Sequence, residues 1–273
     1  VMLTSANSIN VGRLVPQIVY YFDSCKQLVQ QGVIQVGDKV SFTVPTGNFG
    51  DVLAGYYAYL MGLPVEKFYV ASNANRVLTD FLTSGIYDRN RDFIQTISPS
   101  MDILISSNLE RLLYYASNKD TQKVAGWMQE LNEKGRYQVD EQTFETIKNL
   151  FACASVDDNG TRQEIHDVYE KTKYLLDPHS AIAYKVAKDN AGRPVVSLAT
   201  ASPYKFSQDV LKALNINEEN EWVAMDELSK YCQDVIPAQL KELRDLAILH
   251  NQVIDVDSMK DVVCQSTQEV FHD

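Results

Sequence analysis

The spacing of apolar residues in the first part of the chain predicts one long helix. Between residues 8 and 31 the apolar side chains fall on a single helical stripe, made of Leu14, Ile18, Phe22, Cys25 and Val29. Ser8 is placed to cap this helix and Gly32 is placed to end it. Residues 1–5 are typical of the end of a strand that enters a loop, and they lack the basic and apolar segments of a secretion signal.

Strand and helix patterns then alternate. Residues 39–44 and 67–71 are typical of strands, and helical patterns cover 51–61 and 76–84. From about 108 to 173 the chain predicts only helices, at Leu109–Ala116, Gln122–Lys134, Glu141–Phe151 and Arg162–Lys173. The alternation resumes with a helix at 180–188 and a buried strand at 194–199, and the tail carries a further helix at 238–249. We therefore predict an α/β fold, an open, mostly parallel sheet flanked by helices, with a helical insertion at about 108–173.

Composition and charge narrow the function classes. The 273 residues carry 25 Lys+Arg against 36 Asp+Glu, a net charge of −11, and 45% of them are hydrophobic. This balance argues against a nucleic-acid groove or a binder of anionic membranes, since both need a basic patch. No apolar run approaches the roughly 18 residues that a membrane-spanning helix needs. The net negative charge does not exclude a small anionic ligand, because such a ligand needs only a locally positive pocket.

The cysteines and histidines do not indicate a metal site. Cys25, Cys153, Cys232 and Cys264 lie far apart and form no C-x-x-C pair, so we expect buried, reduced thiols in a cytoplasmic protein. The four histidines (His166, His179, His250 and His272) have no ligand spacing.

The strongest local feature is the loop that follows the strand at 39–44. In Pro45-Thr46-Gly47-Asn48-Phe49-Gly50-Asp51 two glycines bracket a short turn, and a helix begins directly after it. Free backbone N–H groups at a helix N-terminus favour an anion, and glycine lets the backbone approach a phosphate closely. The sequence is neither G-x-G-x-x-G nor a P-loop, so an ordinary turn between strand and helix stays the alternative.

Two further stretches place polar side chains where a ligand could bind. Thr200 follows the buried strand at 194–199, at the edge of a parallel sheet where ligands bind, although a Ser/Thr turn explains it equally well. Asn7, Ser8, Asn10 and Arg13 surround a helix start and could cradle an anion. A capping cluster beside a solvated arginine is the alternative for this group.

Taken together and in order, these stretches resemble the threonine synthases. The matching segments are Thr4–Asn10, Pro45–Asp51 with Leu53-Ala54-Gly55, Asp177-Pro178-His179-Ser180-Ala181, and Ala199-Thr200-Ala201-Ser202-Pro203-Tyr204-Lys205-Phe206. The resemblance implies a fold-type II enzyme that uses pyridoxal 5'-phosphate (PLP) and converts O-phospho-L-homoserine and water to L-threonine and phosphate, the last step of threonine biosynthesis. Residues 1–273 would form the C-terminal, PLP-binding part of such an enzyme.

The resemblance also implies roles for residues. Gly47, Asn48, Phe49, Gly50 and Asp51 match the loop that binds the cofactor phosphate, and Thr200 matches the residue that hydrogen-bonds the pyridine nitrogen. Asn7, Ser8, Asn10 and Arg13 lie in the stretch that matches the substrate side of the pocket.

Two departures from the family pattern bear on activity. The family's Schiff-base lysine lies in a Phe-Lys-Asp context upstream of Asn7–Asn10, and no lysine of this chain has that context. We therefore expect a C-terminal fragment that is inactive alone and whose partner is the missing N-terminal part of the same enzyme. The second departure is Ser202, where the family commonly has histidine. The alternatives are another fold-type II PLP enzyme, such as a dehydratase or a cysteine synthase-like enzyme, and a non-catalytic fragment that binds phosphate or PLP.

Overall fold

A four-stranded parallel sheet forms the centre of the fold. The computed structural model describes residues 6–190, 192, 194–249 and 251–270, so the predicted strand end at 1–5, and with it Thr4 and Ser5, lies outside the described residues. The sheet has the order β5-β2-β1-β6, with strands β1 (Val40–Pro45), β2 (Val65–Ser72), β5 (Phe151–Ser155) and β6 (Val195–Ser197). Every pairing in it is parallel, which confirms the predicted fold class.

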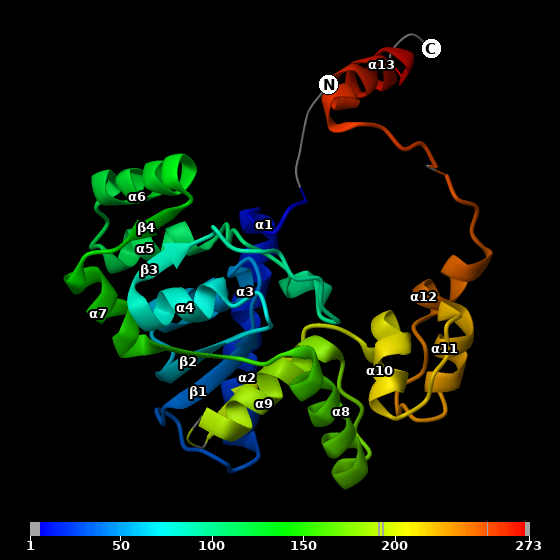
Figure 1. Ribbon diagram of the computed structural model, residues 1–273. Coiled ribbons are helices and arrows are strands. Elements are labelled where there is room, and N and C mark those ends of the chain that lie inside the picture. The colour runs from blue at the N-terminus through cyan, green and yellow to red at the C-terminus, as the bar shows by residue number, and fades with distance from the viewer. Residues whose placement is uncertain (1–5, 191, 193, 250, 271–273) are drawn as a thin grey trace. The chain divides into compact units, whose positions relative to one another are not determined.

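Helices cover both faces of this sheet (Figure 1). One face packs against α9 (Pro178–Asn190), and α8 (Asp158–Thr172) lies beside α9. The other face carries the main hydrophobic cluster, to which α2 (Ile18–Gln30), α3 (Gly50–Leu60), α4 (Val77–Ser84), α5 (Leu109–Ala116) and α7 (Glu141–Leu150) contribute. Strand β2 shows why both faces are apolar: Phe68 and Val70 belong to the main cluster, while Tyr69 and Ala71 pack on the α9 side.

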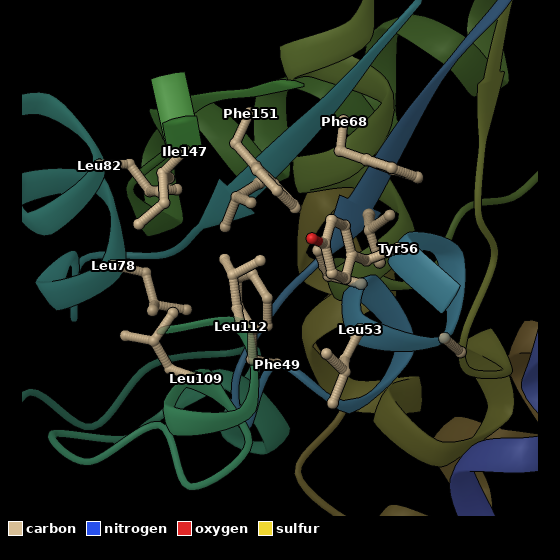
Figure 2. Close-up of a cluster of buried hydrophobic side chains, with 14 of the residues drawn as sticks. Phe49, Leu53, Tyr56, Phe68, Leu78, Leu82, Leu109, Leu112, Ile147 and Phe151 are labelled. Carbon is tan, nitrogen blue, oxygen red and sulfur yellow. The ribbon is translucent and has the colours of Figure 1, made fainter. Parts of the chain in front are cut away.

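Aromatic side chains fill the main cluster (Figure 2). The rings of Phe68 and Phe151 stack with their centroids 5.5 Å apart, and Phe42 stacks on Phe68 at 6.0 Å. The ring of Phe49 lies 6.0 Å from that of Phe151, so the loop before α3 is tied directly into this core.

The helix predicted over residues 8–31 is interrupted. It consists of α1 (Val11–Leu14), the 3₁₀ turn η1 (Val15–Gln17) and α2, because Pro16 cannot donate the hydrogen bond that a continuous helix requires. The cap is Asn10, whose Oδ1 accepts from Gly12 N, and Ser8 is therefore not the cap that we predicted. Gly32 lies just after α2 in the left-handed conformation (φ 70°) and ends the helical region, as predicted.

The span 108–173 contains the predicted helices and two strands that the pattern did not predict. Besides α5, α6 (Thr121–Lys134), α7 and α8, it holds β4 (Arg136–Gln138) and the edge strand β5. Strand β4 pairs with β3 (Ile86–Asp88) in a separate antiparallel ribbon. Strand β5 was missed because Phe-Ala-Cys-Ala-Ser is short and rich in alanine, which is depleted in strands.

The rest of the chain adds short elements. The turns η2 (Pro99–Met101) and η3 (Pro203–Phe206) and the helices α10 (Ser207–Ala213) and α11 (Glu221–Leu228) belong to the same compact unit, Ala6–Val235. A second unit holds α12 (Ala238–Glu242), η4 (Leu243–Asp245), η5 (Val256–Ser258) and α13 (Met259–Val270).

Two expectations for side-chain burial and helix length were wrong. The helix predicted at 238–249 ends at Asp245, and Ile248 and Leu249 beyond it are 83% and 82% exposed, so no packing extends it. Of the four cysteines, which are all unpaired, Cys25 is buried, whereas Cys153 and Cys232 are half-buried and Cys264 is exposed.

Candidate anion and cofactor site

A cavity of about 830 Å³ opens at the carboxyl ends of β1 and β6. Its wall includes Pro45 at the end of β1 and Thr46 after it, Leu198 to Ala201 after β6, and residues of α1 and the start of α3. These segments are far apart in sequence and meet because β1 and β6 are neighbours in the sheet. A parallel sheet binds its ligands at this edge, and the volume is within the usual range of about 300–1,000 Å³ for small-molecule sites.

In the loop Gly47–Gly50 the backbone carbonyl groups are hydrogen-bonded to the protein, whereas the backbone donors are not. Its carbonyl groups are held from behind, since Gly47 O accepts from Ser106 Oγ (2.9 Å) and Asn48 O accepts from Asn108 Nδ2 (2.9 Å). Within the described part of the chain, no group accepts a hydrogen bond from the N–H of Gly47, Asn48 or Phe49. These donors, with the N-terminal end of α3, form the kind of site that binds phosphate.

Phe49 fixes the loop to the protein core. It has a left-handed backbone (φ 61°), which is unusual for a bulky residue, and its side chain is 1% exposed. Burial of the ring stabilises a backbone conformation that would be unfavourable in isolation. The aromatic residue in the Gly-Asn-Phe-Gly sequence is therefore the anchor of the loop, and its glycines are the part that faces the cavity.

Gly47 leaves room that no other residue would. A Cβ atom at this position would lie 2.6 Å from Ser100 O and 3.3 Å from Met101 Cα. Both neighbours are backbone atoms, so a side chain here would push two segments apart. The close approach explains why glycine stands at this position, and the N–H groups without an acceptor within the described residues are compatible with a bound phosphate group.

Asp51 places a carboxyl group in the same wall. Its Oδ1 and its backbone oxygen both accept from the hydroxyl of Tyr21, at 3.1 and 2.7 Å. Burial raises the pKa of Asp51 to about 6, although the hydrogen bond from Tyr21 acts in the opposite direction. The carboxyl is therefore neutral below about pH 6 and negative above it, where it repels a bound anion.

This charge change predicts a pH-dependent affinity for anions. Sulfate stays a dianion from pH 5 to pH 8, so its dissociation constant reports the protein groups alone. We expect sulfate to bind about fivefold more tightly at pH 5 than at pH 7, which corresponds to a rise of about one unit in the pKa of Asp51 when sulfate binds. His179, Arg13 and Lys205 also line the cavity, and only the Asp51 contribution is removed in Asp51→Asn. Isothermal titration should show a flatter pH profile for that variant, and an unchanged profile would contradict the assignment.

The four predicted substrate-side residues do not all face the cavity. Asn7, Ser8 and Arg13 line it, whereas Asn10 does not, because its side chain caps α1 through Gly12 N at 2.8 Å. Arg13 Nη1 donates to Ala6 O (2.8 Å), which orients the guanidinium group. The capping role and the cavity-lining role, which the sequence left as alternatives, are thus both present in one short segment.

Thr200 lines the opposite wall, together with Leu198, Ala199 and Ala201. The residue is exposed and lies three positions after the end of β6. Ser202, where the family commonly has histidine, is not among the lining residues. Its hydroxyl caps η3 by accepting from Tyr204 N, so it has a structural contact of its own.

His179 is the main cavity residue that sequence reasoning left without a role. It is 2% exposed, and its Nδ1 lies 3.1 Å from Asp177 Oδ1, so this nitrogen donates and the other accepts. Its Nε2 accepts from Ser100 N (3.3 Å), a hydrogen bond that requires the neutral ring. The Asp-Pro-His sequence was a signal, because an acid two residues before a histidine at a helix start can fix its tautomer.

Other residues that line the cavity belong to no motif that could be identified in the sequence. Ser100 and Met101 come from the long connection after β3, and Gln17 and Tyr20 come from η1 and α2. Lys205 also lines the cavity, and within the described residues no carboxylate pairs with it. Arg13 and Lys205 thus give the cavity two cationic side chains in an otherwise acidic chain.

The fold and the cavity together indicate a class of protein. A parallel sheet flanked by helices on both faces is the architecture of fold-type II PLP-dependent enzymes, and solved threonine synthases share this fold with the chain. Residues 180–263 match the family described as "Threonine synthase, C-terminal". The PLP-bound threonine synthase from Brucella melitensis superposes with a TM-score of 0.76 at 40% identity, over 92% of this chain and 50% of that chain.

The chain is thus a relative of the threonine synthases. It is 40% identical over 263 residues to threonine synthase from Saccharomyces cerevisiae, which covers 89% of this chain and 48% of the yeast protein. It is also 44% identical over 223 residues to threonine synthase-like 1 from Macaca fascicularis, over 81% of this chain and 30% of that protein. The chain therefore spans half or less of the length of these relatives.

Within the described residues, no helix combines the length and the apolar character that crossing a membrane would require.

Proposed function

We propose that this chain provides the cofactor-phosphate loop and the substrate-side wall of a PLP-dependent threonine synthase, which converts O-phospho-L-homoserine and water to L-threonine and phosphate. One observation carries the proposal: a single cavity is lined by Gly47–Asp51, by Thr200, and by Asn7, Ser8 and Arg13. The similarity to threonine synthases in sequence and fold supports this substrate over those of other fold-type II enzymes.

The residues of the chain divide the work by position. The N–H groups of Gly47, Asn48 and Phe49 and the N-terminal end of α3 hold the cofactor phosphate. The hydroxyl of Thr200 hydrogen-bonds the pyridine nitrogen, and a hydroxyl, unlike a carboxylate, does not enforce a protonated ring. The cofactor, when bound, supplies an electron sink for proton removal from the substrate.

Charged and polar groups on the other wall bind the substrate. Arg13, with the side chains of Asn7 and Ser8, offers donors for the substrate phosphate and stabilises its charge as it leaves. Asn10 has an indirect part, because it caps α1 and so orients Arg13. Asp51 is held by Tyr21 at the start of α3, where its charge suits the helix dipole.

A second part of the same enzyme is the proposed partner. No lysine of this chain stands in a Phe-Lys-Asp context, so we assign the covalent anchor of the cofactor to the part of the relatives that lies outside the matched half. Exposed apolar side chains between α1 and the start of α2 support a contact with that part. Val11, Val15 and Val19, spaced by one helical turn, are 58%, 52% and 61% exposed.

The decisive experiment is a cofactor titration combined with an activity assay on the purified chain. We expect the chain to bind PLP saturably and non-covalently and to release no phosphate from O-phosphohomoserine. Phosphate release should appear after the N-terminal part of a relative is added. Borohydride treatment followed by peptide mapping identifies any lysine that traps the cofactor. Stoichiometric labelling of Lys205 with turnover would contradict the two-part proposal, and absence of PLP binding would contradict the cofactor assignment and favour another anion.

Thr200→Val tests the ring contact at nearly constant side-chain volume. Loss of one hydrogen bond, worth about 1 kcal/mol, should weaken PLP binding about fivefold. Fluorescence titration with PLP measures the effect. Thr146→Val is the matched control, because its hydroxyl bonds Gln142 O on the exposed side of α7. Equal PLP affinity in the two variants would move the ring contact to another residue.

A further inference from the structure

The segment Thr96–Asp102 forms the outer support of the anion loop. It belongs to the connection between β3 and α5, and its Ser100 and Met101 line the cavity. The backbone of Ser100 lies so close to Gly47 that a Cβ there would come within 2.6 Å of its oxygen. Any movement of this segment therefore changes the space available to the loop.

Asp102 holds the segment in place without touching the cavity. Its Oδ1 accepts from Asn73 Nδ2 (2.7 Å), Asn75 Nδ2 (2.9 Å) and Thr96 Oγ1 (2.7 Å). Its Oδ2 accepts from the backbone N–H of Thr96 (2.9 Å). Hydrogen bonds to an ionised acceptor are about twice as strong as neutral ones, so this single carboxylate dominates the local network.

The donors that bind Asp102 are themselves rigid. Asn73 and Asn75 follow directly after β2 and are 1% and 4% exposed. Asn75 N donates to Asn73 Oδ1 (2.9 Å), and Asn75 Oδ1 accepts from Ile94 N (2.9 Å). Asp102 thereby connects the end of a central strand to the segment that supports the loop.

The same segment is held from its other side by His179, whose Nε2 accepts from Ser100 N. The position of Ser100 beside Gly47 is thus determined by α9 through His179 and by β2 through Asp102. Both supports consist of specific hydrogen bonds with defined geometry.

We propose that Asp102 is a positioning residue for the anion loop, keeping Ser100 against Gly47 so that the N–H groups of Gly47, Asn48 and Phe49 converge on one anion. The inference rests on the proposed function for the nature of that anion, a phosphate group. The positioning itself is independent of the ligand.

Asp102→Asn tests this at constant size. The amide oxygen can replace Oδ1, but the amide NH₂ then faces the N–H of Thr96, and two donors oppose each other. We expect faster hydrogen exchange of the three amides whose hydrogen bonds hold the loop, Thr46 N on Ala71 O, Leu53 N on Phe49 O and Asn108 N on Asn48 O. We also expect about tenfold weaker binding of inorganic phosphate, because small displacements of binding groups are costly. Thr96→Val removes one donor to Asp102 and also the acceptor of Ser98 N (3.1 Å), so it should change both in the same direction.

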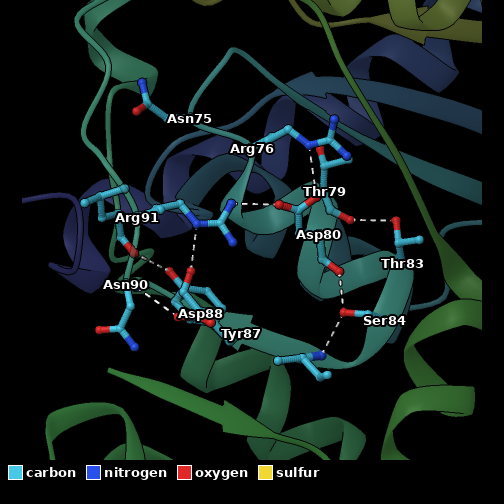
Figure 3. Close-up of polar contacts among 12 residues, drawn as sticks. Asn75, Arg76, Thr79, Asp80, Thr83, Ser84, Tyr87, Asp88, Asn90 and Arg91 are labelled. Carbon is cyan, nitrogen blue, oxygen red and sulfur yellow. Dashed lines mark hydrogen bonds and ion pairs between the residues drawn. The ribbon is translucent and has the colours of Figure 1, made fainter. Parts of the chain in front are cut away.

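Asp80→Asn is the matched control. Asp80 is also a half-buried carboxylate that ties the same connection to the protein, through Arg91 Nη1 at 2.7 Å, and it accepts as well from Arg76 Nε (2.9 Å) beside it at the start of α4 (Figure 3). It contacts neither Ser100 nor Gly47, so its loss should lower the urea midpoint without changing the exchange of the Thr46, Leu53 and Asn108 amides.

The outcomes separate the two proposals. Faster loop exchange in Asp102→Asn, but not in Asp80→Asn, supports the positioning role. Loop exchange equal to wild type in Asp102→Asn, at temperatures where both proteins are folded, overturns it, and so does equal acceleration in the two variants. If the wild-type chain binds no phosphate, the proposed function fails, while the exchange result still decides the role of Asp102.

Discussion

Replacing Gly47 by alanine should weaken the binding of PLP and of inorganic phosphate by about 10- to 100-fold. The added Cβ would lie 2.6 Å from Ser100 O and 3.3 Å from Met101 Cα. Real Cβ atoms do not approach backbone that closely, so the loop and the supporting segment must separate. Such overpacking typically costs about 1–3 kcal/mol, and that energy is lost from binding when the anion requires the original spacing.

Gly126→Ala is the control for the loss of a glycine. This residue lies inside α6, where a Cβ meets nothing within 4 Å. Alanine there should raise the free energy of unfolding by about 1 kcal/mol, because glycine is a poor helix former, and should leave PLP binding unchanged. Circular dichroism and urea unfolding check that Gly47→Ala still folds. Wild-type affinity in a folded Gly47→Ala protein would show that the loop does not bind the phosphate.

Asp177→Ala should be the most destabilising of the substitutions considered, by about 3–5 kcal/mol. The carboxylate is 2% exposed and accepts from His179 N (2.8 Å), His179 Nδ1 (3.1 Å) and Ser180 N (3.3 Å), and also from the hydroxyl of Ser180. Alanine leaves all these donors buried without an acceptor, at a cost of about 1–3 kcal/mol for each that water cannot reach. The loss of a buried charged partner has a similar magnitude.

Asp140→Ala separates this effect from the loss of a simple helix cap. Asp140 caps α7 through Thr143 N at 3.1 Å, but its side chain is 37% exposed. Its replacement should therefore cost only about 1 kcal/mol. Urea unfolding of both variants measures the difference, and equal losses would mean that the contacts of Asp177 inside the protein add nothing to its capping role.

The difference in unfolding free energy between wild type and Asp177→Ala should depend on pH, because it follows the pKa of Asp177. Burial alone would raise that pKa, but the hydrogen bonds from His179 and Ser180 outweigh it, and the pKa lies below its usual value. A carboxyl with a lowered pKa stabilises the folded state above the pKa of the unfolded chain, and this stabilisation is lost as the pH falls through the folded-state value. The gap in unfolding free energy between wild type and Asp177→Ala should therefore shrink below about pH 4.

Local patterns were sufficient for much of the fold. Alternation of apolar runs and helical stripes predicted the parallel sheet, and β1, α3, β2 and α4 lie within a few residues of the predicted ranges. Burial drives these elements, and burial is visible in sequence as periodicity. The pattern failed at β5, whose small residues resemble no strand, and at 246–249, where apolar residues have nothing to pack against.

In the candidate site, too, some features were visible in the sequence and others were not. The sequence by itself determined that Gly47–Asp51 is a glycine-rich turn before a helix, because backbone freedom and helix capping are properties of neighbouring residues. Only the tertiary structure decided that Thr200, Arg13, His179 and Ser100 face this turn across one cavity, and that Asn10 does not. The pairing of β1 with β6 and the hydrogen bonds of Asp102 and His179 bring these groups together. The strand pairing joins residues about 150 positions apart and the His179 bond joins residues 79 positions apart, and no local pattern records which of them will meet.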